Sequence, residues 1–270
     1  MMSSFKTVEL SEKTYESGNL RFLTVKSPNL KGRGDICLFV PSSNQELRDL
    51  PIYILLHGVY GSSWAWAMKG GAAQSAQTMI EANQIKPAII AMPSDGLWGD
   101  GSAYLPHHQK NFEEWIVSDV PTAVRENIPE ASDASVLCIG GLSMGGYGAL
   151  MLGAKHGEKF KAASGHSSIT KLMELKDFVE EPIDDYKTEG VLYDVIDAMK
   201  FHHDKLPKIR FDCGISDSLL DANRKLHQEM DTAGIKHIYE EFDGGHEWPY
   251  WQDHVTKTFM FFDKATNLDC

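Results

Sequence analysis

The feature that most constrains the fold is the peptide Gly-Leu-Ser-Met-Gly at 141–145, which has the pattern G-x-S-x-G. The apolar residues at 136–139 suit a buried strand, and the small residues at 145–154 suit a closely packed helix. Between a strand and a helix, this pattern makes a strained turn that lifts the serine hydroxyl clear of the sheet, with glycine beside it for lack of room. We therefore expect Ser143 to be a nucleophile. The alternative, an incidental serine in a glycine-rich turn, does not account for the strand and helix on either side.

Strand and helix patterns alternate along the rest of the chain, which predicts an α/β fold. The expected sheet is mostly parallel, with helices on both faces, and 1–270 should form one domain. A polar turn is expected at 41–44, a long loop at 97–110, and a polar excursion at 168–206 that has one or two short helices, no strand, and room for a small cap. Pro121 should bend or restart the helix around it. The expected strands lie at 6–15, 20–25, 34–40, 51–57, 87–92, 160–167, 208–214 and 237–242, and the other helices at 74–83, 111–127, 218–233 and 251–262.

A serine hydroxyl needs a base to take its proton and a carboxylate to hold that base. In this kind of scaffold the chain order should be serine, acid, histidine, each after a strand. Asp217 follows the strand at 208–214, and His246 follows the strand at 237–242 in a glycine turn. Among the competing acids, Asp212 and Asp221 lie inside an element, and Asp243 is too close to His246. Among the competing histidines, His57 comes too early in the chain. The others lack a glycine turn after a strand near the C-terminus: His166, His202, His203, His227, His237 and His254.

Two further groups of residues should complete an active site. An oxyanion needs two preset N–H donors, and we expect them from Met144, at the start of the helix, and from Val59, with Gly58 as the alternative. Aromatic residues gather in the same loops, and four of them should wall an acyl or alcohol pocket: Trp64, Trp98, Tyr104 and Trp248.

Composition limits the partners. The formal net charge is −12 and no basic surface is evident, so nucleic acid is not an expected partner. No signal peptide and no apolar stretch of roughly 20 residues is visible, which predicts a cytoplasmic protein without a membrane partner. The four cysteines are scattered along the chain: Cys37, Cys138, Cys213 and Cys270. The paired histidines His107–His108 and His202–His203 lack the spacing of metal ligands. No metal or other cofactor is therefore expected.

Four motifs in order resemble the esterase D-like family of α/β-hydrolases: LLHG at 55–58, GLSMGGYGA at 141–149, CG-x-x-D at 213–217 and GGH-x-W at 244–248. The family includes bacterial tributyrin-type carboxylesterases, feruloyl esterases and S-formylglutathione hydrolases, and the resemblance covers about 34–262. It implies the α/β-hydrolase fold and catalytic Ser143, Asp217 and His246. Leu142 and Tyr147 look more like the bacterial carboxylesterases, because the glutathione thioesterases more often carry histidine at both places.

The sequence therefore predicts a serine carboxylesterase that cleaves a small-molecule ester through an acyl-enzyme. Short acyl groups, from acetyl to butyryl, are expected because no large apolar lid is visible. The alternatives are a thioesterase like S-formylglutathione hydrolase, a feruloyl or carbohydrate acetyl esterase, an acyltransferase on the same scaffold, and a binding module without catalysis. Surface aromatic residues are compatible with a homodimer.

Overall fold

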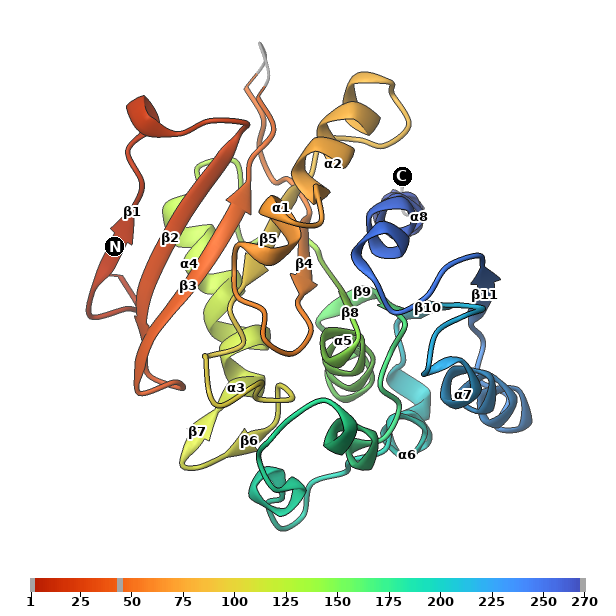
Figure 1. Cartoon of the computed structure of the whole chain (residues 1–270). Coiled ribbons are helices and arrows are strands. Elements are labelled where there is room, and N and C mark those ends of the chain that lie inside the picture. The colour runs from red at the N-terminus through yellow and green to blue at the C-terminus, as the bar shows by residue number, and fades with distance from the viewer. Residues whose placement is uncertain (1–2, 43–45, 268–270) are drawn as a thin grey trace.

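The computed structural model describes residues 3–42 and 46–267. A nine-stranded sheet lies at the centre of the fold (Figure 1). The strand order is β1-β2-β3-β5-β4-β8-β9-β10-β11. β1 pairs antiparallel with β2, β2 with β3, and β3 with β5. All other pairs are parallel, so the sheet is mostly parallel, as expected. The strands are β1 (Val8–Leu10), β2 (Leu20–Ser27), β3 (Gly32–Phe39), β4 (Ile52–Leu56), β5 (Ile89–Pro93), β8 (Leu137–Leu142), β9 (Phe160–His166), β10 (Lys208–Gly214) and β11 (Ile238–Phe242).

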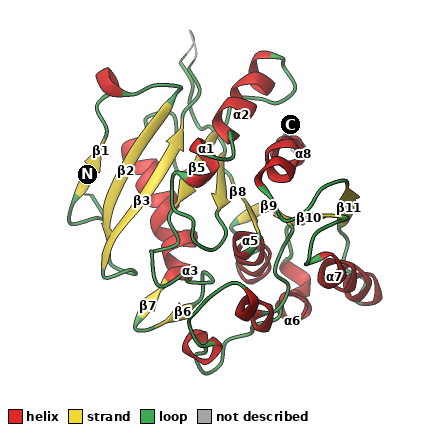
Figure 2. Ribbon diagram, in the orientation of Figure 1, coloured by secondary structure: helices red, strands yellow, loops and turns green. Residues whose placement is uncertain are grey.

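Helices cover both faces of the sheet, which confirms the expected layers (Figure 2). The central strands β4, β5 and β8 are buried at every residue, because side chains on both of their faces meet a helical layer. One layer consists of α1 (Ala65–Met68), α2 (Ala72–Glu81) and α8 (Trp248–Thr266). The other consists of α3 (Phe112–Glu114), α4 (Val120–Asn127), α5 (Met144–Lys155), α6 (Val195–Phe201) and α7 (Leu220–Thr232).

Three expected elements differ in detail. The strand expected at 6–15 ends at Leu10 and is followed by a 3-10 turn, Lys13–Tyr15. The helix expected at 111–127 contains a π-helical turn, Trp115–Asp119, after which the Val120 N–H donates to the Trp115 carbonyl oxygen. α4 follows directly, with Pro121 in its first turn, where proline has no N–H to donate. Likewise α8 begins at Trp248, three residues earlier than expected, with a proline in its first turn.

The two long connections contain short elements. The loop at 97–110 leads into a small hairpin formed by β6 (Pro106–His107) and β7 (Lys110–Asn111). All of 168–206 is described, and it holds α6, the 3-10 turns Leu172–Asp177, Ile183–Tyr186 and His203–Lys205, and one isolated bridge between Lys171 and Asp194. Short helices without a strand were expected there.

Three further predictions concern the cysteines, the polar turn at 41–44 and membrane-spanning segments. Cys37, Cys138 and Cys213 are buried free thiols, whereas Cys270 and residues 43–44 of the expected polar turn lie outside the described residues. Within 3–42 and 46–267, no helix has the length and apolar character needed to cross a membrane.

The register brings five strand ends to one edge of the sheet. Leu56 of β4 pairs with Gly141 of β8, Leu142 with His166 of β9, His166 with Asp212 of β10, and Gly214 with Phe242 of β11. The loops that follow β4, β8, β10 and β11 therefore lie next to one another at the carboxyl edge, where open α/β sheets usually bind ligands.

Candidate active site

The turn between β8 and α5 holds Ser143 in a strained conformation, with φ 54° and ψ −120°. The Ser143 N–H donates to the carbonyl oxygen of His166 at 2.9 Å, which anchors the turn to β9. A Cβ on Gly141 would collide with carbonyl oxygens of Gly145 and Leu56, and one on Gly145 with the Leu56 and His57 carbonyls. The G-x-S-x-G spacing thus has a steric cause here.

The structure brings together the three residues of the predicted triad. The Ser143 Oγ lies 3.0 Å from His246 Nε2, and His246 Nδ1 lies 3.0 and 3.1 Å from the two carboxylate oxygens of Asp217. Ser143 and His246 are 103 residues apart in the chain, and the sheet register makes them neighbours. A carboxylate on one ring nitrogen and a hydroxyl on the other is the arrangement that lets an imidazole take a proton from serine.

Asp217 is buried and well supplied with donors. Besides the His246 ring, the Leu219 N–H donates to Asp217 Oδ1 at 2.8 Å. Burial raises the pKa of this carboxyl, but the hydrogen bond and charge of His246, the Leu219 N–H and the Ser167 hydroxyl together bring the pKa below its usual value. The carboxylate is therefore ionised at neutral pH and can orient an imidazole.

The backbone N–H groups predicted for an oxyanion site are available. In the described part of the chain, neither Val59 nor Met144 donates its N–H to another residue, and the same holds for Gly58. Met144 is the first residue of α5, where the helix dipole favours negative charge. A Cβ on Gly58 would lie 2.9 Å from Leu142 Cδ1 and 3.3 Å from the Ser143 Cβ, so this loop packs directly against the nucleophile turn.

A buried hydrogen-bond network supports the Val59 loop from behind. His57 Nδ1 lies 2.7 Å from the Gly58 oxygen and must donate to it, and His57 Nε2 accepts from the Asp95 N–H at 3.1 Å. His57 is thereby a neutral structural residue with its proton on Nδ1. The Tyr104 hydroxyl donates to the His57 carbonyl oxygen at 2.9 Å.

A cavity of about 310 Å³ opens beside Ser143 and His246. Trp64 and Trp248 line it, as predicted. The predictions for Tyr104 and Trp98 are corrected: Tyr104 is fully buried beneath the Val59 loop, and Trp98 packs against His107 and Tyr186 instead, with ring centroids 4.5 and 5.1 Å apart.

Sequence reasoning missed Phe178, Trp251 and Lys69, which also line the cavity. The Phe178 ring lies 5.5 Å from the His246 ring, and its carbonyl oxygen accepts from the Tyr60 hydroxyl. Phe178 belongs to the 168–206 excursion, which has no periodic pattern, so no sequence signal pointed to it. Lys69 Nζ lies 5.6 Å from the Trp248 ring centroid and is the cavity's one lysine or arginine among the described residues.

Two rejected candidates, Asp212 and His166, form a buried structural pair. The His166 Nδ1 lies 3.0 Å from Asp212 Oδ1, and Arg210 Nη1 donates to Asp212 Oδ2 at 2.5 Å. Burial raises the pKa of Asp212, but His166, Arg210 and the Tyr250 hydroxyl lower it well below its usual value. The pair lies within the sheet and is not part of the cavity lining.

Comparisons with known proteins agree with this geometry. A family model described as "Putative esterase" matches residues 27–262. An acetyl esterase from Caldicellulosiruptor saccharolyticus is 27% identical, over 92% of this chain and 93% of its own. An S-formylglutathione hydrolase from Staphylococcus aureus superposes with a TM-score of 0.77 at 17% identity, over 94% of this chain and 99% of that one. A ferulic acid esterase superposes with a TM-score of 0.76 at 22% identity, over 97% and 99%. These solved structures confirm the α/β-hydrolase fold.

Proposed function

The chain belongs to this esterase family, in agreement with its resemblance to esterase D-like enzymes, and is a serine esterase of carboxylic esters; on that premise we propose that Ser143, His246 and Asp217 are its catalytic residues. The observation that carries the proposal is the continuous chain of contacts from the Ser143 hydroxyl through His246 to Asp217, beside the cavity.

The proposed reaction proceeds through an acyl-enzyme. The Ser143 Oγ attacks the ester carbonyl carbon while its proton passes to His246 Nε2, and Asp217 accepts a hydrogen bond from His246 Nδ1–H. The N–H groups of Met144 and Val59 receive the oxyanion, and each such donor typically contributes about 2.7–4 kcal/mol to the transition state. Collapse expels the alcohol, which takes the proton from His246. Water, deprotonated by the same imidazole, then releases the acid.

We expect short acyl groups, from acetyl to butyryl. The cavity beside Ser143 measures about 310 Å³ and is lined mainly by apolar side chains, Trp64, Leu142, Phe178, Trp248 and Trp251 among them. The acetyl esterase among the relatives supports this preference. Thioester, feruloyl and carbohydrate acetyl substrates and transfer to an acceptor alcohol remain alternatives.

The domain organisation and the location of the protein also belong to the proposal. In it, 1–270 forms one domain, and 168–206 is a small cap whose Phe178 covers one side of His246. A cytoplasmic location and a homodimer stay predictions from the sequence.

The test compares p-nitrophenyl acetate, butyrate and octanoate and methyl ferulate on wild type and Ser143→Ala. Turnover should be fastest for acetate or butyrate and should fall by about 10⁴-fold or more in the variant. Ser118→Ala, a half-buried serine bonded to Glu114, is the matched control and should keep full activity. Full activity in Ser143→Ala would refute the nucleophile. Ester product formed with added alcohol acceptors would identify a transferase.

A further inference from the structure

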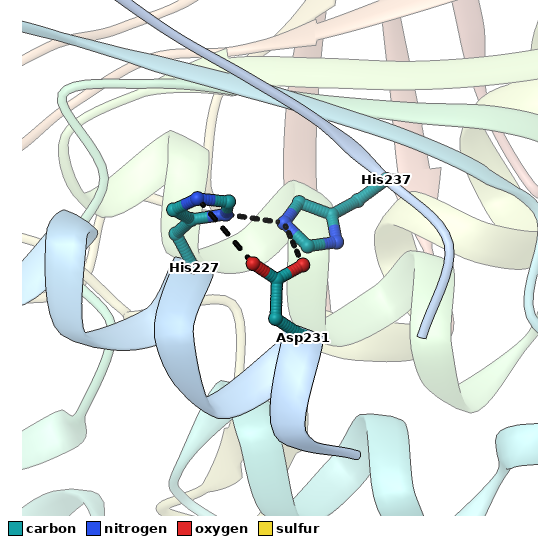
Figure 3. A group of neighbouring side chains, drawn as sticks. All are labelled: His227, Asp231 and His237. Carbon is teal, nitrogen blue, oxygen red and sulfur yellow. Dashed lines mark hydrogen bonds and ion pairs between the residues drawn. The ribbon is translucent and has the colours of Figure 1, made fainter. Parts of the chain in front are cut away.

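A second cluster of polar side chains joins α7 to β11 (Figure 3). His227 and Asp231 lie one turn apart in the second half of α7, and His237 directly precedes β11. Asp217 precedes α7 and His246 follows β11, so this cluster lies at the opposite ends of the two elements from the triad. It is separate from the esterase site.

Each of the three residues offers one ligand atom, and these atoms lie within 4.8 Å of one another. His227 Nδ1 lies 2.7 Å from His237 Nε2, His227 Nε2 lies 3.6 Å from Asp231 Oδ2, and His237 Nε2 lies 3.9 Å from Asp231 Oδ1. Two ligand atoms of a tetrahedral zinc site with bonds of about 2.0 Å are about 3.3 Å apart. One ion can take only one ring nitrogen of His227. With one ligand atom from each residue, side-chain rotation would have to close these separations to bring all three residues onto one ion.

The hydrogen bonds around His237 leave a lone pair aimed into the cluster. Its Nδ1 lies 2.8 Å from the Ile235 carbonyl oxygen, which can only accept, so Nδ1 carries the proton and Nε2 is the free acceptor. A metal-binding histidine commonly donates its other ring N–H to a backbone carbonyl in this way, which fixes the tautomer and the ring orientation.

Packing holds both rings in place. The His237 side chain is only 3% exposed and stacks on Phe211, with ring centroids 5.6 Å apart. The His227 ring stacks on Tyr239 at 4.8 Å. Asp231 is 63% exposed, so the outer side of the cluster is open to solvent and to exchange of an ion.

Without an ion, the two imidazole rings share one hydrogen bond. One hydrogen must lie between His227 Nδ1 and His237 Nε2, and it belongs to His227 because His237 carries its own on Nδ1. A cation bound by His237 Nε2 would take the place of this hydrogen bond.

We propose that His227, Asp231 and His237 bind one divalent transition-metal ion. Two imidazoles and one carboxylate are typical ligands of zinc, and water would complete the coordination. The ion would tie the end of α7 to the start of the edge strand β11, so its role is structural rather than catalytic.

The test uses the full chain, freed of any affinity tag and treated with chelator, then titrated with Zn²⁺ while the melting temperature and binding heat are measured. One equivalent should bind, and at 100-fold excess over Kd the melting temperature should rise by about 5 °C or more. Co²⁺ in place of Zn²⁺ should give visible absorption bands. Hydrolysis of a short ester well below the melting temperature should not change.

The variants Asp231→Asn, at an exposed position, and His227→Gln, at a half-buried one, remove one ligand each, and both should fold and weaken Zn²⁺ binding at least 10-fold. Asp221→Asn, exposed on the same helix, and His203→Gln, with a side chain 52% exposed, are the matched controls and should bind like wild type. Absence of a stoichiometric Zn²⁺ site in wild type, or equal binding in both ligand variants, would overturn the proposal, and neither result bears on the esterase reaction.

Discussion

At the scale of single residues, the orientation of His246 depends on Asp217. Asp217→Asn keeps the shape of the side chain but presents an amide that can stabilise the wrong tautomer of the ring, so kcat for p-nitrophenyl acetate should fall by about 10⁴-fold. The measurement is steady-state kinetics with a folding check by circular dichroism. Asp243→Asn, an exposed carboxylate in the neighbouring turn, should leave kcat unchanged. Equal losses in the two variants would show that Asp217 is not the orienting acid.

The aromatic residues provide a second test at this scale. Trp64 and Trp248 line the cavity, whereas Trp98 packs on His107 and Tyr186 away from it. Trp64→Ala should therefore raise KM for p-nitrophenyl butyrate about 10-fold, because it removes part of the apolar cavity wall. Trp64 is 47% exposed, so its replacement does not open the core. Trp98→Ala should lower the melting temperature and leave KM unchanged. A KM effect of Trp98→Ala equal to that of Trp64→Ala would contradict the described cavity.

At the scale of elements, the 97–110 loop braces the loop that carries Val59. Tyr104 contributes the hydroxyl that donates to the His57 carbonyl, and Asp100 accepts from the Tyr60 N–H through its carbonyl oxygen at 2.8 Å. We therefore predict that Tyr104 is a positioning residue: it does not line the cavity, and its hydroxyl holds the backbone proposed to receive the oxyanion.

Tyr104→Phe removes this one buried hydrogen bond and keeps the ring. Because a misplaced donor weakens transition-state binding more than ground-state binding, kcat should fall about 10-fold while KM stays within twofold of wild type. The unfolding free energy should fall by about 1 kcal/mol. Tyr15→Phe, an exposed tyrosine, is the control. A change confined to stability would assign Tyr104 a purely structural role.

Part of the fold and of the candidate site could be predicted from the sequence. The central strands and the order of Ser143, Asp217 and His246 were predictable, because apolar runs and glycine turns are local signals. Phe178 and the cluster of His227, Asp231 and His237 were not, because their contacts depend on how an irregular segment folds back and on which face of α7 meets β11. Tyr104 and Trp98 were assigned to the pocket because a one-dimensional pattern does not distinguish an aromatic residue that walls a cavity from one that supports its loop.

At the scale of the whole molecule, a carboxylate that is buried and paired in the folded state makes stability depend on pH, and Glu113 is one of these. Glu113 contacts Lys155 and lies 2.7 Å from His156 Nε2, at the end of α5 opposite Ser143. Burial raises the pKa of Glu113, but the hydrogen bond from His156 and the charge of Lys155 bring the pKa below its usual value. A carboxyl whose pKa is lower in the folded state stabilises the fold above its unfolded pKa, about 4.3, and loses that contribution as the pH falls through the folded pKa.

Glu113→Gln should therefore destabilise the protein by about 1–3 kcal/mol at pH 7, and the difference from wild type should shrink below about pH 4. Urea unfolding of both proteins between pH 7 and pH 3 measures that difference. Glu189→Gln, an exposed residue in the 168–206 excursion, should show no difference at either end. If the gap between wild type and Glu113→Gln were the same at pH 3 as at pH 7, the cost would come from altered packing, and the ion pairs of Glu113 would not be the source of its stabilisation.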